Sequence, residues 1–179
     1  FVLFDDADQV KIIAKNHQYI GVNRAYERFL KRWEIDGKLW VFWHTQGSGK
    51  TALAYYNVKY LTHYFQQKNV IPKFYFIVDR LDLLIQAGKE FRSRGLVVHN
   101  INSREEFSKE IKTTSVIHNN SGKPEITVVN IQKFQDDPDL IKNTDYNLNI
   151  QRVYFLDEVH RSYNPEGSFL ANLNQSDKN

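Results

Sequence analysis

The sequence has 179 residues, of which 41% are hydrophobic, and its formal net charge is +3. This length and composition predict one domain with a packed core, and the mildly basic charge permits a nucleic-acid partner without requiring one. The absence of cysteine excludes disulfides and cysteine-ligated zinc sites, and no apolar run is long enough to cross a membrane.

The first residues, Phe1–Phe4, are strand-like, and the sequence contains no methionine. We therefore expect the chain to be an internal part of a longer protein. It shows no secretory pattern at its start, so a cytoplasmic protein with no membrane attachment is the default expectation.

Three helices are expected from the spacing of apolar residues and from stop signals. The first runs from about Asn16, expected to be its N-cap, to Trp33. The second runs from Thr51 to about residues 67–69, and the third covers residues 81–94, where Gly95 ends it. Ser103 and Glu106 form a capping box that predicts a fourth helix, with Phe107 pointing inward. The buried face of the first helix is expected to consist of Val22, Tyr26, Phe29, Leu30 and Trp33.

Apolar strand-like segments alternate with these helices. The expected strands are residues 39–43, 73–79, 96–99, 126–130 and 152–157. The segment 73–79 is apolar nearly throughout, which is typical of a strand covered on both faces. The alternation predicts an α/β fold with a mainly parallel sheet and helices on both faces.

The most informative stretch joins strand 39–43 to the second helix. Its sequence is His44–Thr45–Gln46–Gly47–Ser48–Gly49–Lys50–Thr51. The glycines would let the backbone N–H groups approach phosphate oxygens at a helix N-terminus, Lys50 would reach the β- and γ-phosphates, and Thr51 would ligate Mg²⁺. His44 occupies the first glycine position of the G-x-x-x-x-G-K-[ST] pattern, so the match is incomplete. A simple Gly-Ser-Gly turn with a solvated lysine is the alternative.

A second motif follows the last apolar strand. Asp157 would hold the Mg²⁺ shell, and Glu158 would orient and polarise the attacking water. Both motifs should lie beyond the carboxyl ends of the strands, so Lys50, Thr51 and the two acids are expected at one crevice. A solvated strand end is the alternative for the acids alone.

These two motifs resemble motifs I and II of superfamily-two DExH helicases and translocases. Three further stretches narrow the resemblance, which spans about residues 1–170, to the motor (R) subunit of type I restriction enzymes. They are Val78–Asp79–Arg80 with Gln86 downstream, Asn130–Ile131–Gln132–Lys133–Phe134, and Asp157–Glu158–Val159–His160–Arg161–Ser162.

The resemblance implies that residues 1–179 are the first RecA-like lobe of an ATP-dependent double-stranded DNA translocase, with residues 1–38 as its adenine-motif region. It implies ATP and Mg²⁺ as ligands, and duplex DNA and the modification and specificity subunits as partners, in a bacterium or archaeon. The sequence has no counterpart of the family's motif III, second lobe, completing arginine or nuclease residues. We therefore expect the isolated chain to be inactive.

The resemblance also implies roles for individual residues. Gln18 would read the adenine, and His160 and Arg161 would couple the ATP site to the neighbouring lobe. The implied catalytic residues are Lys50, Asp157 and Glu158; the ATP-binding residues are Gln18, Thr45, Gln46, Gly47, Ser48, Gly49, Lys50 and Thr51; the metal ligands are Thr51 and Asp157; and the DNA-contact candidates are Asp79, Arg80, Gln132 and Lys133.

Several alternatives remain open at this point. Asp79 and Arg80 could form a helix cap and a salt bridge, and Gln132 and Lys133 could be solvated. The chain could come from another DExH helicase or a type III restriction subunit, or be a nucleotide-dependent binding module. A small-molecule P-loop kinase fits less well, because Glu158 suits hydrolysis whereas a kinase must exclude water. The tyrosines of the second helix are expected to pack against another helix, and His17, His63, His99 and His118 to be structural.

Overall fold

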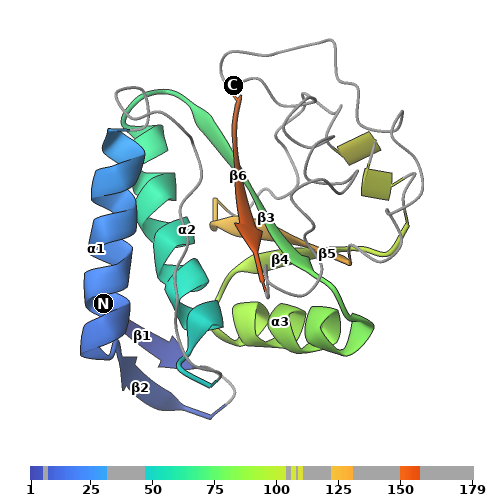
Figure 1. Ribbon diagram of the computed structural model, residues 1–179, viewed down its shortest axis with the longest axis horizontal. Coiled ribbons are helices and arrows are strands. Elements are labelled where there is room, and N and C mark those ends of the chain that lie inside the picture. Colours follow the sequence, from blue (N-terminus) through green and yellow to red (C-terminus); the bar gives the residue numbers. More distant parts are fainter. Residues whose placement is uncertain are drawn as a thin grey trace.

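A computed structural model of the chain describes residues 1–5, 8–31, 47–103, 106–107, 109–110, 122–130 and 150–157. These residues form a four-stranded sheet, a separate two-stranded sheet and three long helices (Figure 1). None of the helices in this part of the chain is long and apolar enough to cross a bilayer. The elements are β1 (Val2–Asp5), β2 (Val10–Ile13), α1 (Asn16–Leu30), α2 (Lys50–Gln66), β3 (Ile71–Val78), α3 (Leu81–Ser93), β4 (Val97–Ile101), β5 (Glu125–Asn130) and β6 (Ile150–Leu156).

The larger sheet has the order β4-β5-β3-β6, and every neighbouring pair is parallel. Ile77 is in register with Leu156, and Val78 is in register with Asn130, so β3, β5 and β6 end at the same edge. Residues 74–78 of β3 are each at most 5% exposed. The predicted parallel α/β architecture is therefore confirmed. The fifth expected strand, residues 39–43, lies outside the described residues.

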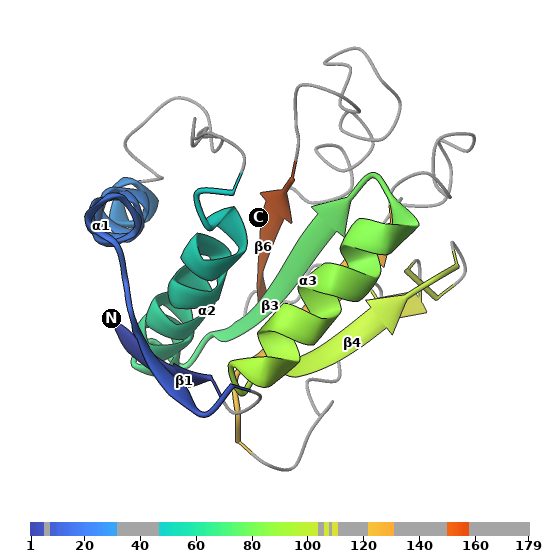
Figure 2. The same cartoon turned by 90° about the horizontal axis from the view of Figure 1, so that it is seen from below.

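Side chains of β3 alternate between two covered faces of the sheet. Phe76 points to the face that carries α2 and α3, where its ring centroid lies 5.2 Å from that of Phe91. Figure 2 shows α3 laid along this face with α2 beside it. Tyr75 points to the opposite face, where its ring meets Phe107 edge-on at 5.9 Å. Since the described residues around Phe107 are helical, helical structure lies on both faces, as predicted.

Aromatic side chains join α1 to α2. Tyr26 packs edge-on against Tyr60 and Tyr64 at centroid distances of 6.0 and 5.8 Å, and Phe29 packs against Phe65 at 5.3 Å. The helix-packing role expected for the tyrosines of α2 is confirmed. These contacts hold α1 alongside α2 (Figure 1).

Three local predictions need correction. The N-cap residue of α1 is Lys15, and Asn16 lies inside the helix. Leu30, expected on the buried face, is 42% exposed, because α1 ends at this residue. The β1–β2 hairpin was only half expected, since the sequence pattern indicated a strand at residues 1–4 but none at Val10–Ile13. Trp33 lies outside the described residues.

Charged residues gather in the amino-terminal halves of the strands of the parallel sheet. Nζ of Lys73 lies 3.5 Å from Oε1 of Glu110, and Nε2 of His99 lies 3.1 Å from Oε2 of Glu125. Burial lowers the pKa of Lys73, and the nearby Glu110 carboxylate opposes that shift. The hydrogen bond to Glu125 raises the pKa of His99, against the effect of burial. With Arg152, which is in register with Lys73, these residues form what we call the amino-end cluster.

Candidate phosphate-binding site

The loop before α2 is shaped by two glycines in the left-handed region. Gly47 has φ +75° and Gly49 has φ +85°, conformations that cost other L-residues energy. Gly49 is also the N-cap of α2, and a Cβ on it would collide with Nε2 of Gln18. A Cβ on Gly47 would meet nothing within 4 Å. Gly47 is thus required by its backbone angle alone, and Gly49 by both its angle and its surroundings.

The first turn of α2 is suited to an anion. It carries Lys50 and Thr51 and contains no acidic residue. The first N–H groups of any helix lack partners within the helix, and the aligned peptide dipoles place partial positive charge there. In a helix of 17 residues that follows a glycine loop, this arrangement fits a phosphate group.

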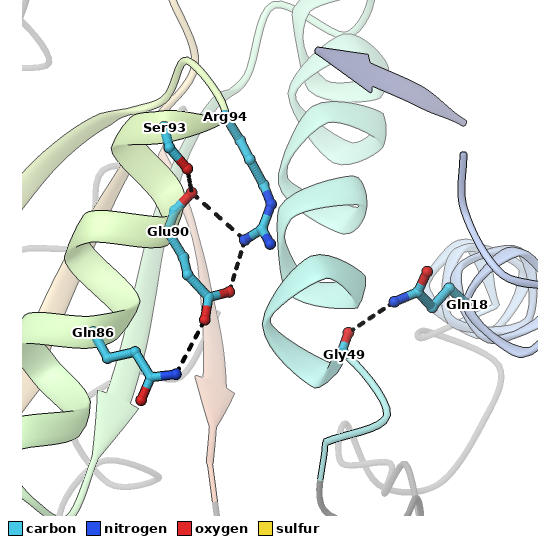
Figure 3. Close-up of polar contacts among 6 residues, drawn as sticks. All are labelled: Gln18, Gly49, Gln86, Glu90, Ser93 and Arg94. Atoms are coloured by element: carbon cyan, nitrogen blue, oxygen red, sulfur yellow. Dashed lines mark hydrogen bonds and ion pairs between the residues drawn. The ribbon is translucent and has the colours of Figure 1, made fainter. Parts of the chain in front are cut away.

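The first turn of α1 contacts the same loop. Nε2 of His17 lies 2.8 Å from the carbonyl oxygen of Ser48, and Nε2 of Gln18 donates to the carbonyl oxygen of Gly49 at 3.2 Å (Figure 3 shows the Gln18 contact). The Oε1 atom of Gln18 accepts the backbone N–H of Lys15 at 2.9 Å. Gln18 is only 7% exposed, so its amide is fixed at both ends beside the glycine loop.

Asp157 directly follows β6 at the carboxyl edge of the sheet. Its backbone N–H donates to the carbonyl oxygen of Ile77 at 2.9 Å, which fixes it beside the end of β3. Figure 2 shows the first turn of α2 and the arrowheads of β3 and β6 at the same end of the sheet. The structure thus places Lys50, Thr51 and Asp157 at one end. Within the described part of the chain, no three His, Asp or Glu side chains come together as a metal site.

The two described DNA-contact candidates differ in their surroundings. Asp79 follows β3 and is buried, at 8% exposed. Arg80 occupies the N-cap position of α3, and its guanidinium pairs with the Asp82 carboxylate at 2.7 and 3.0 Å. The cap position and salt bridge considered as the alternative for Arg80 are therefore both present. Gln86, from the same stretch of sequence, donates to the Glu90 carboxylate within α3 at 3.3 Å (Figure 3).

Some predicted residues lie outside the described residues, so their positions stay predictions. They are His44, Thr45, Gln46, Gln132, Lys133, Glu158, His160 and Arg161.

Comparison with known proteins adds the family. The profile of the SWI2/SNF2 ATPase family matches residues 17–176, which is most of the chain. The chain belongs to the SWI2/SNF2 ATPase family. A parallel sheet flanked by helices agrees with the RecA-like ATPase lobe that was expected. The match begins at His17 and continues past Asp157, so it includes the α1 contacts, the glycine loop and the end of β6.

This SWI2/SNF2 ATPase domain also has relatives among restriction enzymes. It is 35% identical over 135 residues to a putative type I restriction enzyme MjaVIIP endonuclease subunit of Methanocaldococcus jannaschii. The aligned region covers 70% of this chain and 12% of that protein. It is 29% identical over 170 residues to the type I restriction enzyme HindI endonuclease subunit of Haemophilus influenzae. Here the aligned region covers 90% of this chain and 15% of that protein. The chain therefore spans only about an eighth to a seventh of the length of these relatives. The predicted relationship to type I restriction subunits is confirmed.

One residue that contacts the glycine loop was not expected to do so. His17 was expected to be structural, because it forms no metal-ligand spacing with other histidines. In the fold it contacts the glycine loop 31 positions away. Its place immediately before Gln18, in the first turn of α1, was the available signal.

Proposed function

We propose that this chain is the ATP-binding lobe of the motor subunit of a type I restriction enzyme, an ATP-driven double-stranded DNA translocase. The SWI2/SNF2 family match and the named type I relatives support the proposal. The observation that carries it is the loop before α2. Two left-handed glycines and an acid-free helix start adapt this loop to a phosphate, and it lies at the same sheet edge as Asp157.

Phosphoryl transfer depends mainly on positioning and on stabilising charge on the transferred group. In our proposal the loop amides and Lys50 bind the triphosphate, and Gln18 contacts the adenine from α1. Thr51 and Asp157 would hold Mg²⁺, which when bound neutralises negative charge on the phosphates. Glu158 orients the attacking water and accepts its proton. Thr45, Gln46 and Ser48 complete the loop around the phosphates.

The proposed partners follow from the same relationship. Residues 1–179 would be the first RecA-like lobe, with residues 1–38 carrying the adenine motif. A second lobe, the nuclease and the modification and specificity subunits would come from elsewhere in the complex. His160 and Arg161 would couple the lobes, and Asp79, Arg80, Gln132 and Lys133 are the proposed DNA contacts.

DNA-stimulated ATP hydrolysis by the full-length protein tests this function. Lys50→Ala and Glu158→Gln should each lower turnover by at least about 10²-fold, because each removes a group that stabilises or orients the reacting atoms. Glu158→Gln should keep ATP binding, since Asp157 and the loop remain. Lys68→Ala is the matched control, because Lys68 is an exposed lysine beyond the other end of α2. Normal turnover in Lys50→Ala would disprove the proposed site.

The 179-residue chain alone provides the second arm of this test. An arginine from a facing domain contributes roughly 10³–10⁵ in rate to related phosphate-loop enzymes. We expect the isolated chain to bind ATP weakly and to hydrolyse it negligibly, with or without duplex DNA. Strong DNA-stimulated turnover by the chain alone would show that the site is complete within it.

A further inference from the structure

Two consecutive side chains of α1 contact two consecutive carbonyls of the glycine loop. Nε2 of His17 is 2.8 Å from the Ser48 oxygen, and Nε2 of Gln18 is 3.2 Å from the Gly49 oxygen. A carbonyl oxygen only accepts hydrogen bonds, so Nε2 of His17 must carry a proton and donate. The Ser48 carbonyl is therefore held toward α1. The Gly49 carbonyl accepts from Gln18 and also from the Leu53 N–H of α2, at 3.1 Å.

This arrangement determines where the loop amides point. A peptide unit is planar and trans, so its C=O and N–H point in opposite directions, and no cis peptide occurs in the described residues. The unit that contains the Ser48 carbonyl also contains the Gly49 N–H, and the next unit contains the Lys50 N–H. Holding the Ser48 carbonyl toward α1 turns the Gly49 N–H away from α1. The Gly49 carbonyl accepts from Leu53 along α2, so the Lys50 N–H points the other way, toward the space before the first turn of α2.

We propose that His17 is a positioning residue for the phosphate loop, which keeps the Gly49 amide directed at a bound polyphosphate whatever base is attached. This inference rests on the proposed function. Gln18 has a second hydrogen on Nε2 for a base, whereas the Nε2 proton of His17 is committed to Ser48. The two neighbours therefore have different roles. His17 increases affinity for the phosphates, whereas Gln18 both positions the loop and contributes to base selectivity.

The position of His17 is fixed by packing rather than by the loop. The Oε1 atom of Gln18 accepts the Lys15 N–H, which closes the first turn of α1. Tyr19, the next residue but one, packs edge-on against Phe1 at a centroid distance of 4.6 Å, and Phe1 packs against Tyr60 of α2 at 5.1 Å. Because α1 is anchored to α2 in this way, the imidazole has a defined place relative to Gly49, the N-cap of α2.

Equilibrium binding of ATP, GTP and inorganic tripolyphosphate, each with Mg²⁺, to the full-length protein tests this inference. His17→Phe keeps a ring but removes the donor, and it should weaken all three ligands by a similar factor of roughly 5 to 10. His17→Gln places an amide near the position of Nε2 and should restore most of the affinity. Gln18→Ala should change the ratio of ATP to GTP affinity, and His17→Phe should leave that ratio unchanged.

The outcomes separate this inference from the proposed function. If the wild-type protein binds none of the three ligands, both are overturned. If the wild-type protein binds them and His17→Phe binds them equally well, only the role of His17 is overturned. A changed ATP to GTP ratio in His17→Phe would also overturn it, because the residue would then act on the base. If His17→Phe does not fold, His17→Asn replaces it, because the asparagine amide is too short to reach Ser48. Equal ligand affinities in His17→Asn and His17→Gln would then overturn the role of His17.

Discussion

The two ends of the parallel sheet use polar residues in different ways. At the carboxyl edge, the glycine loop and Asp157 are held through backbone groups: the Ser48 and Gly49 carbonyls are bound by α1, and the Asp157 N–H is bound by Ile77. At the amino end, charged side chains pair with one another, as Lys73 does with Glu110 and His99 with Glu125. When a segment is anchored through its backbone, its side chains stay available for a ligand. When charged side chains pair with one another, their charges are neutralised within the fold.

This difference matters for finding sites by electrostatics. Strongly shifted pKa values often mark functional residues. Here Lys73 and His99, whose pKa values are shifted by burial and by a hydrogen bond, belong to the amino-end cluster. The cluster lies at the end of the sheet away from the glycine loop. In this fold the shifted groups indicate how the core accommodates charge, and loop geometry indicates the candidate site.

The largest effect that separates the two ends is expected from Gly49→Ala. The added methyl group would strain the left-handed backbone at this position and would displace Gln18. The loop amides would then lose their orientation. Each charge-assisted hydrogen bond contributes about 1.5–3 kcal/mol, so loss of two should weaken ATP binding by 10²-fold or more. Calorimetric titration of the folded variant with ATP–Mg²⁺ measures this.

Gly95→Ala is the matched control for Gly49→Ala. Gly95 has φ +86°, almost the same as Gly49, but a Cβ there meets nothing within 4 Å. Both variants should lose about 1–2 kcal/mol of stability from left-handed strain. Only Gly49→Ala should lose ATP affinity. Equal ATP affinity in the two variants would mean that the loop does not contact the nucleotide.

A smaller effect, on stability alone, is expected from Glu110→Gln at the amino end. This change removes the carboxylate beside Lys73, which is only 6% exposed, and leaves the Glu110 carbonyl that accepts from Nζ at 3.4 Å. A buried charge that loses its partner is costly, and the remaining contact limits that cost to about 1–2 kcal/mol. Urea unfolding should show this loss, while ATP affinity of the folded protein stays unchanged.

A second substitution sharpens the test. Adding Lys73→Met to Glu110→Gln removes the buried charge of Lys73, so the double variant should recover most of the lost stability. If the double variant is less stable than Glu110→Gln, Lys73 contributes through contacts other than the Glu110 carboxylate. A fall in ATP affinity in either variant would contradict the separation between the two ends of the sheet.

The parts of the fold that local patterns encode were predictable. Residues 74–78 are apolar at every position, which indicates a strand covered on both faces. Gly95 marked the end of α3, and it does adopt a left-handed angle just after Ser93. The glycine loop and Asp157 were recognisable because each directly follows a strongly apolar segment of the sequence.

Features that depend on distant contacts were not predictable. β2 is only four residues long and contains Lys11, and its identity as a strand comes from the register of Val2 with Ile13. The position of His17 beside Ser48 depends on α1 packing against α2, which no local pattern reports. Leu30 had the right spacing for the buried face, but its place at the end of α1 exposes it.

The smallest effect is expected from the pH dependence of the His99–Glu125 pair. The hydrogen bond to Glu125 raises the pKa of His99 above its ordinary value of about 6.5. A group whose pKa is higher in the folded state stabilises the fold below its unfolded pKa, and this contribution is lost as the pH rises through the folded pKa. The pair should therefore stabilise the protein fully below about pH 6.5 and progressively less above it.

Unfolding free energies measured between pH 5.5 and 8.5, a range of about 1.5 units on either side of neutrality, would reveal this contribution. Because the His99 side chain is 33% exposed, the effect should be below about 1 kcal/mol. Glu125→Gln keeps an acceptor for His99 but removes the carboxylate charge, so stability of this variant should fall less with pH than that of the wild type. His99→Gln has no titrating group at this position and should behave in the same way. Parallel curves for all three proteins would show that the titration of His99 beside Glu125 does not contribute to the pH dependence of stability.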